Sequence, residues 1–485
     1  MSKIHRRDFL KSSIGATAAL FAGCATAPHA RVLGANDDVR VGVIGLRNKG
    51  QHLVRDFLAV KGARVVAVCD ADTAFLDREV EAAGKRKQTL TVYQDLRRML
   101  ESPDIDAVVI AMPNFWHSLA TVWACQAGKD VYVEKPVSHN IWEGRKMVEA
   151  ARKYKRVVQA GTQKRSDPGA QEAFAYIQQG HLGRIKVVRG FCFRERGSIG
   201  IADGTQQVPA TVNYDLWCGP TPLAPLNRKS LHYDWHWFWS TGNGEIGNQG
   251  IHEMDMCRWA LGQNTLPPRV LSLGGRFGYE DDAETPNTQV AILDYEPAPI
   301  IFEVRGLYRK ASDKAMDHYR NIRVGLVVEC EDGYYAGGGG GWIFDHDGNR
   351  IKQFQGDGGG QHATNFIKAV RSRKTEDQVA DILEGHLSSA LCHMANISQQ
   401  LGSRASSDEI QEKIRSDRHA LETLERFQSH LEANEIDLAK TPVVLGPWLA
   451  MDAEKERFVN CPDADAANKL VSRKYRKPYI IPERV

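Results

Sequence analysis

The chain has 485 residues, of which 42% are hydrophobic and 25% charged, and its formal net charge is +3 at pH 7. This length allows two or three globular domains. Because the charge is nearly balanced and no basic tract is interleaved with aromatic residues, a nucleic-acid-binding protein is excluded as the expected class. The 9 cysteines are scattered without a Cys-x-x-Cys pair, so we expect buried thiols and no metal site.

The N-terminal segment is typical of an export signal. Arg6 and Arg7 stand before a moderately apolar run, residues 14–23, that is too short to cross a membrane. Twin arginines in this setting predict a bacterial Tat signal peptide. We assign residues 1–35 to the signal peptide and its linker. We therefore expect a periplasmic or otherwise extracytoplasmic protein, with the Tat export machinery as a partner.

Two kinds of processing are compatible with the end of this signal. Small residues allow cleavage after Ala27 or Ala30. Residues 21–24 also come close to a lipoprotein box, although Phe21 is an unusual leading residue. A lipid anchor at Cys24, which would hold the exported protein at the membrane, therefore stays open.

The next segment predicts the phosphate cradle of a dinucleotide-binding fold. Residues 39–44 are a short apolar run typical of a buried strand, and a glycine turn and a helix follow it. The helix N-terminus in such a unit faces a pyrophosphate. Gly45 and Gly50 match the first and third glycines of G-x-G-x-x-G, whereas Arg47 replaces the second. We predict that these three residues and Asn48 contact a dinucleotide, with Arg47 reaching over its pyrophosphate; an ordinary turn is the alternative.

An acidic residue ends the second expected strand, residues 63–70. Asp70 stands 25 residues after Gly45, close to the roughly 20 residues expected between the glycine turn and the carboxylate that binds the adenosine ribose hydroxyls. A carboxylate at this place repels a 2′-phosphate, and Asp72 adds to the repulsion, so the sequence favours NAD over NADP. A solvated aspartate at a strand end is the alternative.

Strands and helices alternate up to residue 160, which predicts a doubly wound parallel sheet over residues 36–160. Ligands of such sheets bind at the carboxyl ends of the strands. Two of these ends carry polar or aromatic side chains, after the strands expected at 106–112 and 131–133. We therefore expect the following residues beside the cofactor: Pro113, Asn114, Trp116, His117, Glu134 and Lys135.

The pattern changes after residue 160. Strand-like runs, many of them alternating apolar and polar residues, are expected at 185–193, 270–277, 288–295, 300–307 and 322–329. They predict a second α/β domain over residues 161–364, built on a large, open, mainly antiparallel sheet.

Two further segments carry structural expectations. The glycine run 337–341 is expected to be a flexible loop. The remainder, residues 403–485, is expected to be helical to near Phe427 and irregular beyond it, as an arm that covers this molecule or a neighbouring subunit.

The order and spacing of these motifs resemble the glucose–fructose oxidoreductase / inositol dehydrogenase family (Gfo/Idh/MocA). The resemblance covers roughly residues 38–400, and its carriers are the Gly45 turn, Asp70, residues 113–117, Glu134-Lys135-Pro136 and residues 242–255. It implies an N-terminal Rossmann domain, a substrate-binding domain with a large open sheet, and helices at 365–402 that pack back on the Rossmann domain. We also expect a homo-oligomer.

The resemblance implies how the reaction is catalysed. Hydride transfer between NAD and an alcohol requires a cation near the developing alkoxide and a base for the hydroxyl proton. The family's lysine that matches Lys135 is catalytic, and Glu134 can orient it. His252 is the candidate base, because imidazole titrates near neutral pH. The family commonly has an aspartate where this chain has Asn248, and an amide can orient a hydroxyl but cannot carry charge.

Further candidates surround this pair. Asp255 follows His252 by three residues on one helix face, where it can orient His252, hold a substrate hydroxyl or merely cap the helix. The second histidine of a zinc motif is missing, so no metal is expected. Aromatic faces pack on the C–H faces of sugars, so the stretch 232–239 is the candidate carbohydrate contact, with a core hairpin as the alternative. The predicted substrate residues are Trp235, His236, Asn248 and Gln163.

Three functions are compatible with the sequence. The first is an exported NAD-dependent oxidoreductase acting on a CH–OH group of a sugar or polyol; because the periplasm supplies no free NAD, the cofactor should stay bound. The second is an NAD-dependent glycosidase or lyase that oxidises a ring hydroxyl transiently. The third is a non-catalytic sugar-binding protein of the same fold, which the departures at Asn248 and Arg47 favour.

Overall fold

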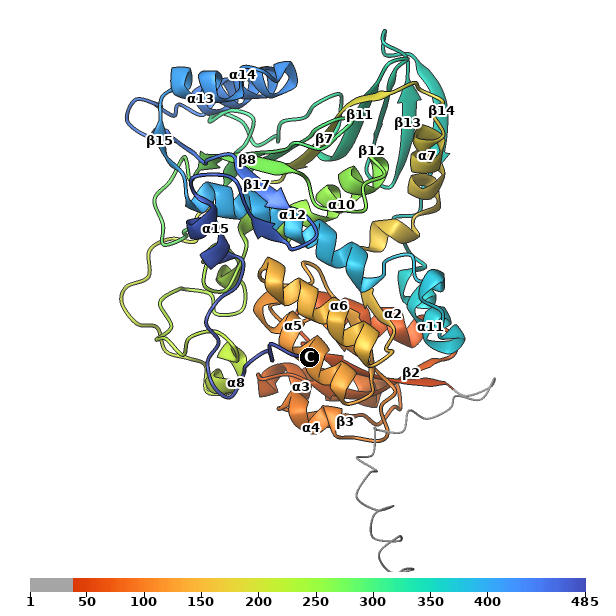
Figure 1. The fold of residues 1–485 in the computed structure, drawn as a ribbon. Coiled ribbons are helices and arrows are strands. Elements are labelled where there is room, and N and C mark those ends of the chain that lie inside the picture. Colours follow the sequence, from red (N-terminus) through yellow and green to blue (C-terminus); the bar gives the residue numbers. More distant parts are fainter. Residues whose placement is uncertain (1–37) are drawn as a thin grey trace, which may run out of the picture.

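The computed structural model describes residues 38–485 as two α/β layers, one above the other in Figure 1. The predicted Tat signal, its cleavage sites and Cys24 lie outside the described residues. Each layer has its own sheet, and α12 (Ile382–Gln400) lies between them. Within residues 38–485, none of the helices combines the length and apolar character that crossing a membrane requires.

The first layer is a six-stranded parallel sheet in the order β3-β2-β1-β4-β5-β6. Its strands are β1 (Val39–Ile44), β2 (Ala63–Cys69), β3 (Thr91–Tyr93), β4 (Ala107–Ile110), β5 (Asp130–Val133) and β6 (Val158–Ala160). Its helices are α2 (Lys49–Ala59), α3 (Thr73–Lys85), α4 (Leu96–Leu100), α5 (Asn114–Gln126) and α6 (Ile141–Lys153). The predicted doubly wound Rossmann sheet is confirmed.

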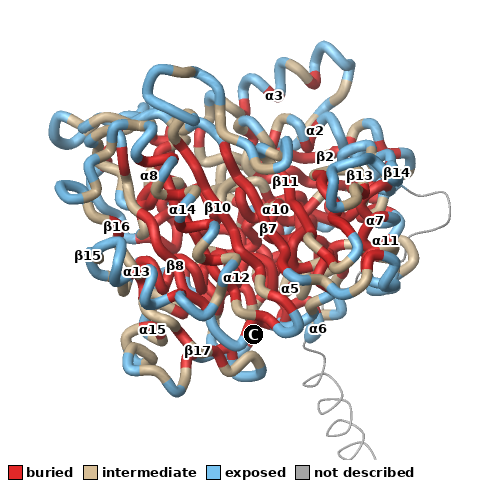
Figure 2. Tube along the Cα trace, turned by 90° about the horizontal axis from the view of Figure 1, so that it is seen from above, coloured by how far each residue is buried: buried red, intermediate tan, exposed pale blue. Residues whose placement is uncertain are grey.

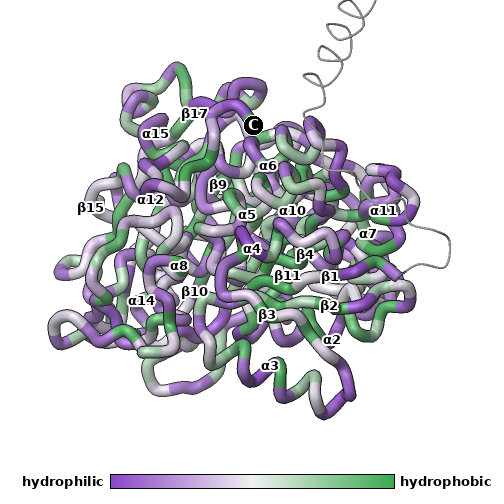
Figure 3. Tube along the Cα trace, turned by 90° about the horizontal axis from the view of Figure 1, so that it is seen from below, coloured by the Kyte–Doolittle hydropathy of each residue, from purple (hydrophilic) through white to green (hydrophobic). Residues whose placement is uncertain are grey.

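The central strands of this sheet are apolar because helices cover both faces. Val41 and Val43 pack with Phe57 of α2, whereas Ile44 and Ile110 pack on the opposite face, with α5. Figure 3 shows the hydrophobic strands among more hydrophilic outer segments such as α3. The carboxyl ends of these buried strands are thereby held rigidly at the edge that faces the second layer.

The second layer is a twelve-stranded, mostly antiparallel sheet with the main order β14-β13-β12-β11-β7-β10-β9-β8-β16-β15. Its strands are β7 (Ile185–Phe193), β8 (Arg269–Gly275), β9 (Thr288–Leu293), β10 (Ile300–Arg305), β11 (Val324–Cys330), β12 (Tyr334–Gly337), β13 (Gly340–Phe344), β14 (Arg350–Gln355), β15 (Ser403–Ala405), β16 (Val443–Leu445), β17 (Leu449–Asp452) and β18 (Arg457–Phe458). The pair β7–β10 is parallel. The predicted large, mainly antiparallel sheet is confirmed.

Both faces of this second sheet are covered. α7 (Pro168–Gln178), α10 (Gly250–Ala260) and α12 pack on one face, and α13 (Ser407–Ile414) and α14 (Arg418–Ala433) on the other. Figure 2 shows the buried band that follows β7, β8, β10 and β11 beneath these helices. Shorter elements are α8 (Tyr214–Cys218), α9 (Gly244–Asn248), α15 (Ala464–Leu470) and the 3₁₀ turns η1 (Gln163–Ser166), η2 (Asp234–Trp237) and η3 (Thr375–Asp377).

The predicted helices between the two layers are present. α11 (His362–Ser372) packs Phe366 and Ile367 against α2, and α12 contacts α6 and β6. Both helices therefore contact elements of the Rossmann domain. Eight cysteines lie within the described residues, all as free thiols; seven are buried and Cys461 is partly buried.

Two local expectations were wrong. The glycine run 337–341 forms the end of a β-hairpin: Gly337 ends β12, residues 338–339 make the turn, and Gly340 begins β13. The region after Phe427 is also ordered: α14 continues to Ala433, β16 pairs with β8, and a small unit of β17, β18 and α15 follows. These strands are short and form by pairing with distant residues, so the local sequence pattern does not reveal them.

Candidate functional site

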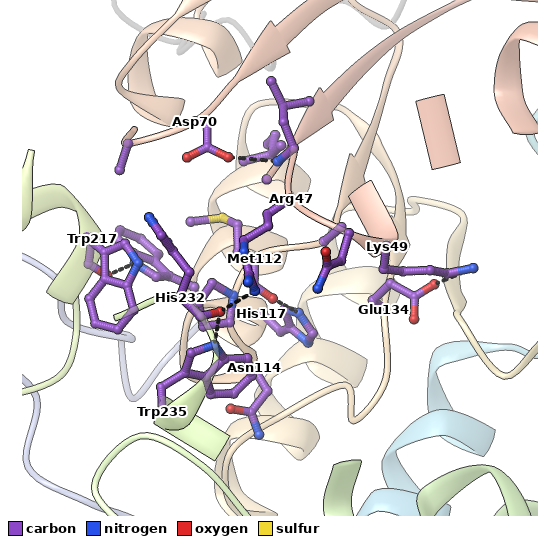
Figure 4. A pocket seen from close by; sticks show the side chains of 18 of the residues that line it. Arg47, Lys49, Asp70, Met112, Asn114, His117, Glu134, Trp217, His232 and Trp235 are labelled. Atoms are coloured by element: carbon purple, nitrogen blue, oxygen red, sulfur yellow. Dashed lines mark hydrogen bonds and ion pairs between the residues drawn. The ribbon is translucent and has the colours of Figure 1, made fainter. Parts of the chain in front are cut away.

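A cavity of about 280 Å³ lies where the carboxyl ends of the Rossmann strands meet the second layer. Its walls come from the glycine turn, the ends of β2, β4 and β5, and the segments around α8, η2 and α9 (Figure 4). Most predicted site residues line it: Gly45, Arg47, Asn48, Asp70, Pro113, Asn114, Trp116, His117, Glu134, Lys135, Trp235, His236 and Asn248. Gly50, Gln163, His252 and Asp255 are not among the lining residues.

The glycine turn is as tight as the sequence predicts. Gly45 has φ +86°, and a Cβ at this residue would lie 2.7 Å from backbone atoms of Ala111. A Cβ on Gly50 would lie 1.8 Å from the carbonyl oxygen of Gly45. Gly50 therefore shapes the turn without lining the cavity. Because neither Gly45 nor Gly50 has a side chain, the backbone of the turn can lie close to the cavity.

Arg47 spans the cavity between the two layers. Its Nη1 donates to the backbone oxygen of His232 at 2.9 Å, as Figure 4 shows. His232 Nε2 in turn lies 2.9 Å from Asp72 Oδ2. The two contacts connect the glycine turn and the end of β2 to the segment that precedes η2. The prediction that Arg47 also reaches a pyrophosphate stays a prediction.

Asp70 occupies the place expected for the ribose-binding carboxylate. Leu46 N donates to Asp70 Oδ2 at 2.7 Å, and Asp72 N donates to Asp70 Oδ1 at 2.9 Å. Burial raises the pKa of Asp70 to about 6, against these backbone hydrogen bonds that lower it. At pH 7 the group is therefore mostly an oriented carboxylate on the cavity wall.

The residues after β4 have two roles: Asn114 offers a polar group to the cavity, whereas Trp116 and His117 hold the surrounding loops. Asn114 Nδ2 donates to Asn243 Oδ1, while its own Oδ1 is buried without a hydrogen-bond partner among residues 38–485. Trp116 Nε1 donates to the backbone oxygens of Leu216 and Trp217. His117 nitrogens face the carbonyl oxygens of Met112 and Pro136 at 2.8 and 2.7 Å, so this ring braces two strand-end loops.

Lys135 places an ammonium group inside the cavity. Its Nζ donates to the backbone oxygen of Asn248 at 2.7 Å. Burial lowers the pKa of Lys135, and the carboxylates of Glu134, Glu245 and Glu253 oppose this effect. Glu134 does not bind this ammonium group as predicted: Glu134 Oε1 accepts from Gln163 Nε2 at 2.9 Å and lies 3.7 Å from Lys49 Nζ.

Gln163 consequently has a different role from the predicted one. Its Nε2 donates both to Glu134 and to the hydroxyl of Tyr132, 3.0 Å away. These partners hold the amide behind the cavity wall, where it orients Glu134. The sequence interpretation placed Gln163 near the substrate because it follows a strand end, but η1 turns its side chain toward β5.

Asn248 carries no negative charge, but a nearby glutamate, which the sequence interpretation missed, supplies one. Glu245, on the same short helix α9, is buried and accepts from Asn248 Nδ2 at 3.1 Å. Arg196 forms a two-pronged ion pair with this carboxylate, with both N···O distances 2.8 Å. The three-residue spacing from Asn248 on a helix is the signal that could have revealed Glu245.

His252 lies on α10, is partly exposed and is not among the residues that line the cavity. Burial lowers its pKa well below the ordinary value, and nearby Lys135 adds to this lowering, so the ring is neutral at pH 7. Its neighbour Glu253 is buried beside Gln249, and burial raises the pKa of Glu253 to about 8.

Asp255 has a structural setting that the prediction of a catalytic role did not foresee. Its carboxylate accepts from Arg165 Nε and Nη2 at 2.9–3.0 Å and from Ser388 Oγ at 2.6 Å. Asp255 is fully buried. The Asp255 carboxylate therefore binds Arg165 and Ser388 instead of orienting His252, and these contacts connect η1, α10 and α12.

The aromatic stretch forms a 3₁₀ turn, so the alternative of a core hairpin is wrong. Trp235 and His236 stack with ring centroids 3.6 Å apart. His236 Nδ1 lies 2.6 Å from the carbonyl oxygen of Tyr233, which requires a proton on Nδ1 and leaves Nε2 as the acceptor nitrogen. Burial lowers the pKa of His236 to about 3, so it is neutral at pH 7.

Several lining residues were not named in the prediction, among them Leu216, Trp217 and Tyr233. Tyr233 hydroxyl is 3.3 Å from Arg196 Nη1. Tyr233 lies within the predicted aromatic stretch 232–239, although the list of substrate residues did not include it. Leu216 and Trp217 carry no such signal, because α8 reaches the cavity only through the folding of the long segment between β7 and α9. Among the described residues, no group of three or more His, Cys, Asp or Glu is arranged to hold a metal ion.

The fold and the cavity define a class: a Rossmann domain that presents a dinucleotide site to a second α/β domain. Residues 39–162 match the model of an oxidoreductase family with an NAD-binding Rossmann fold. Residues 184–301 match the C-terminal α/β domain of the same oxidoreductase family. The chain therefore belongs to the Gfo/Idh/MocA oxidoreductase family, as its motifs indicate.

Relatives and solved structures agree with this assignment. Glycosyl hydrolase family 109 protein 2 of Shewanella sp. (strain ANA-3) is 34% identical over 171 residues, 31% of this chain and 38% of that protein. A glycosyl hydrolase family 109 protein of Solibacter usitatus (strain Ellin6076) is 32% identical over 161 residues, 30% of this chain and 36% of that protein. The similarity thus spans little more than a third of these relatives' length.

The WlbA dehydrogenase from Bordetella pertussis, solved in complex with NADH and UDP-GlcNAcA, superposes with a TM-score of 0.55 at 20% identity. The match covers 74% of this chain and 95% of that chain. An oxidoreductase from Agrobacterium radiobacter, solved with NAD⁺, L-tartaric acid and magnesium, has a TM-score of 0.54 at 15% identity and covers 73% of this chain and 94% of that one. At these identities the likeness establishes the fold.

The residues present fit the NAD that this family binds. The turn between Gly45 and Gly50 places the start of α2 at the cavity, and the first N–H groups of a helix have no partner within the helix and can bind a phosphate. Asp70 supplies an oriented acceptor for ribose hydroxyls. Asn114 Oδ1, buried and unpartnered within the described chain, supplies an acceptor on the cavity wall. Each of these features is what a dinucleotide requires and what an ordinary strand–helix turn does not need.

Proposed function

We propose that this protein is an exported NAD-dependent oxidoreductase that acts on a CH–OH group of a sugar or polyol. The observation that carries the proposal is the buried ammonium group of Lys135 in the same cavity as the Asp70 carboxylate and the glycine turn. A buried cation opposite a dinucleotide site is suited to a developing alkoxide, because a water-poor environment strengthens its interaction with negative charge.

The bound nicotinamide would supply the chemistry of accepting or returning a hydride at the alcohol carbon. Lys135 Nζ holds the hydroxyl oxygen and stabilises its negative charge as the proton leaves. His236 takes that proton on Nε2, because Nδ1 is already committed to the carbonyl of Tyr233. We propose His236 for this role in place of His252, since His236 lines the cavity and His252 does not.

The stacked rings of Trp235 and His236 support a carbohydrate substrate. Aromatic faces offer an apolar surface to sugar C–H groups, while Asn248 and Tyr233 add polar groups on the same wall. This combination of an apolar surface and a few polar groups is typical of small-molecule sites.

The first experiment identifies the nucleotide released from freshly purified protein by its mass and absorbance. A panel of sugars and polyols is then tested for a change in nicotinamide fluorescence on the intact protein. We expect NAD in the protein and a fluorescence change with at least one sugar. Protein without nucleotide that also fails to take up added NAD would contradict the proposal.

Variants then assign the roles. We expect Lys135→Met to reduce turnover about 10²- to 10³-fold, the usual cost of losing a group that stabilises a developing oxyanion, while nucleotide stays bound. We expect His236→Asn to reduce turnover about 10²-fold or more and His252→Asn to have a much smaller effect. The reverse order for the two histidines would assign the base to His252. Full activity in Lys135→Met and His236→Asn would contradict the roles assigned to these residues, whereas sugar binding without any turnover in the wild type would favour a non-catalytic sugar-binding protein.

A second function has its own observation in favour. The most similar relatives reported above are glycosyl hydrolase family 109 proteins, at 34% and 32% identity. A glycosidase of this kind would oxidise a ring hydroxyl to a ketone, eliminate the glycosidic group, add water to the double bond that forms and reduce the ketone again, without net redox change. Elimination beside a transient ketone exchanges the neighbouring C–H with solvent. Aglycone release with deuterium incorporation from D₂O would therefore support the glycosidase, and its absence with net sugar oxidation the oxidoreductase.

Export and cofactor retention belong together in this proposal. The Tat route carries folded proteins, so NAD bound in the cytoplasm would accompany the enzyme to the periplasm. We expect Arg6→Lys with Arg7→Lys to retain the protein in the cytoplasmic fraction, whereas the wild type is periplasmic. Equal distribution of both proteins would contradict Tat export.

Two further expectations have their own tests. If Cys24→Ser releases the protein from the membrane fraction, the lipid anchor is established. The mass of the purified protein in solution tests the homo-oligomer.

A further inference from the structure

The chain ends in a segment that crosses from the second layer onto the Rossmann domain. We define the C-terminal strap as residues 473–485, which follow α15 and end beside α5 in Figure 1. Its first side chain binds the Rossmann domain directly: Arg473 Nε donates to Glu143 Oε1 and Nη2 to the backbone oxygen of Phe115, both at 2.9 Å. The strap is therefore docked on helices α5 and α6.

The middle of the strap grips α8. Arg476 Nη2 donates to the backbone oxygen of Asp215 at 2.8 Å, and its Nη1 pairs with the carboxylate of the same residue. Tyr479 hydroxyl donates to the other carboxylate oxygen of Asp215 at 2.6 Å. These hydrogen bonds, the Tyr479 one foremost, lower the pKa of Asp215. The strap thus holds α8 through Asp215, and Arg476 Nε also donates to the backbone oxygens of Gly219 and Thr221, which follow α8 directly.

Apolar packing fixes the strap as firmly as these polar contacts. The Tyr479 ring lies edge-on to Trp116, with centroids 5.4 Å apart, and beside Trp123 at 6.4 Å. Tyr479 and Ile481 are 1% and 2% exposed. The strap is therefore part of the core under α5 and is not a loose tail.

The residues that the strap holds form a wall of the nucleotide cavity. Leu216 and Trp217 follow Asp215 directly and both line the cavity; Figure 4 shows Trp217 there. Trp116, against which Tyr479 packs, donates its Nε1 to the backbone oxygens of both residues. On the Rossmann side, Asn213 N donates to the backbone oxygen of Ala71 at 2.9 Å. The wall is therefore tied to the end of β2 on one side and to the strap on the other.

We propose that the C-terminal strap is a positioning element that retains the nucleotide, because α8 cannot leave the cavity while the strap holds Asp215. Tyr479 and Arg476 act through Asp215 and Trp116 on Leu216 and Trp217. The inference rests on NAD occupying this cavity, and it explains how an exported enzyme keeps a cofactor that its surroundings do not replace.

The test measures nucleotide release from the full-length protein. Wild type and variants are loaded with radiolabelled NAD and diluted into excess unlabelled NAD, and the label that stays on the protein is followed with time. Tyr479→Phe removes the hydroxyl that donates to Asp215, and Asp215→Asn removes the negative charge that accepts this hydrogen bond and pairs with Arg476; both keep the side-chain volume. We expect each to release NAD about tenfold faster, the effect of losing one charge-assisted hydrogen bond.

The matched control is Tyr295→Phe. Tyr295 is also a buried tyrosine, and its hydroxyl donates to the backbone oxygen of Thr265 at 2.7 Å, but it lies in the second layer and does not line the cavity. Thermal unfolding is recorded for all three variants. We expect similar losses of thermal stability but faster NAD release only in Tyr479→Phe and Asp215→Asn.

The outcomes separate this inference from the proposed function. Release rates of both strap variants equal to wild type, with NAD bound, would overturn the strap and leave the oxidoreductase untouched. Faster release in the control as well would assign the effect to general loosening and would also overturn it. Faster release limited to the strap variants supports the inference even if no sugar proves to be oxidised, since the readout does not depend on turnover. Failure of every protein to bind NAD would overturn both.

Discussion

Asp70 is a half-buried carboxylate held by two backbone amides at the edge of a parallel sheet. Burial alone would favour the neutral acid, and the amides favour the charge; burial is the larger effect, so the pKa rises to about 6. A ribose hydroxyl donates best to the ionised form. At the residue scale, cofactor binding is therefore linked to the protonation of one side chain.

We expect the affinity of the nucleotide-free protein for NAD to fall as the pH is lowered through about 6. Below that pH binding must release the proton from Asp70, which weakens affinity by up to about tenfold per pH unit. Isothermal titration calorimetry measures this slope between about pH 5 and 8, the range in which proteins are usually most stable. Asp70→Asn should bind more weakly with a flat profile; the same slope in this variant would contradict the assignment.

The raised pKa of Asp70 has the opposite effect on folding stability: it makes the fold more stable as the pH is lowered. Because the folded-state pKa of Asp70 is raised from 3.8 to about 6, the folded state binds more protons than the unfolded state between these values. The ionised group therefore destabilises the fold above pH 6, and this cost disappears as the pH falls toward 3.8. NAD binding opposes the cost by favouring the charge.

At the scale of elements, the strand–turn–helix unit β1–α2 depends on two glycines that act differently. Gly45 adopts a positive φ that side chains disfavour, whereas Gly50 sits in a helix and is required by its contact with the Gly45 carbonyl. The first is a conformational requirement and the second is a packing requirement. Both keep the start of α2 close to the cavity.

We expect Gly50→Ala to destabilise the protein by about 1–3 kcal/mol, the usual cost of overpacking, and to weaken NAD binding, because its Cβ would lie 1.8 Å from the Gly45 oxygen. The matched control is Gly84→Ala in α3, where a Cβ meets nothing within 4 Å. That change should stabilise the protein by about 0.5–1 kcal/mol, as helix propensity predicts. Denaturant unfolding with and without NAD measures both; equal effects would contradict the packing argument.

At the scale of the whole molecule, one buried ionic cluster joins the two layers. Arg165 belongs to η1, which follows β6 of the Rossmann sheet. Its partner Asp255 belongs to α10 of the second layer, and Ser388 belongs to α12 between the two layers. Glu384 lies 3.0 Å from Arg165 Nη2 and also pairs with Arg258 of α10, so that two carboxylates face two guanidinium groups. The cluster fixes how the two walls of the cavity face each other.

We expect Asp255→Asn to lower the free energy of unfolding by about 3–5 kcal/mol, because Arg165 would be left as a buried charge with less compensation. Chemical unfolding of the holoprotein measures this loss. Arg184→Gln, which removes an exposed pair with Glu331, is the control and should change stability by less than about 1 kcal/mol. Loss of turnover in Asp255→Asn without loss of stability would restore the catalytic role that the sequence interpretation assigned.

The sequence by itself determined the Rossmann domain, the second sheet and the NAD preference. Their signals are local: apolar strands, a glycine turn followed by a helix, and an aspartate at a strand end. Lys135 could likewise be predicted as a cavity residue, because strand ends of a parallel sheet meet at one edge, and His236 was predicted from the aromatic stretch around it. Gly50 was identified from spacing alone, although its role is to shape the turn.

The tertiary structure decided which polar side chains face the cavity and which hold the molecule together. Gln163 and Asp255 sit at plausible places in the sequence, yet Glu134 and Arg165, distant in the chain, bind them elsewhere. Glu245, Trp217 and Tyr479 matter through contacts made by segments far apart in the sequence. Such contacts depend on long-range packing, and no local periodicity encodes them.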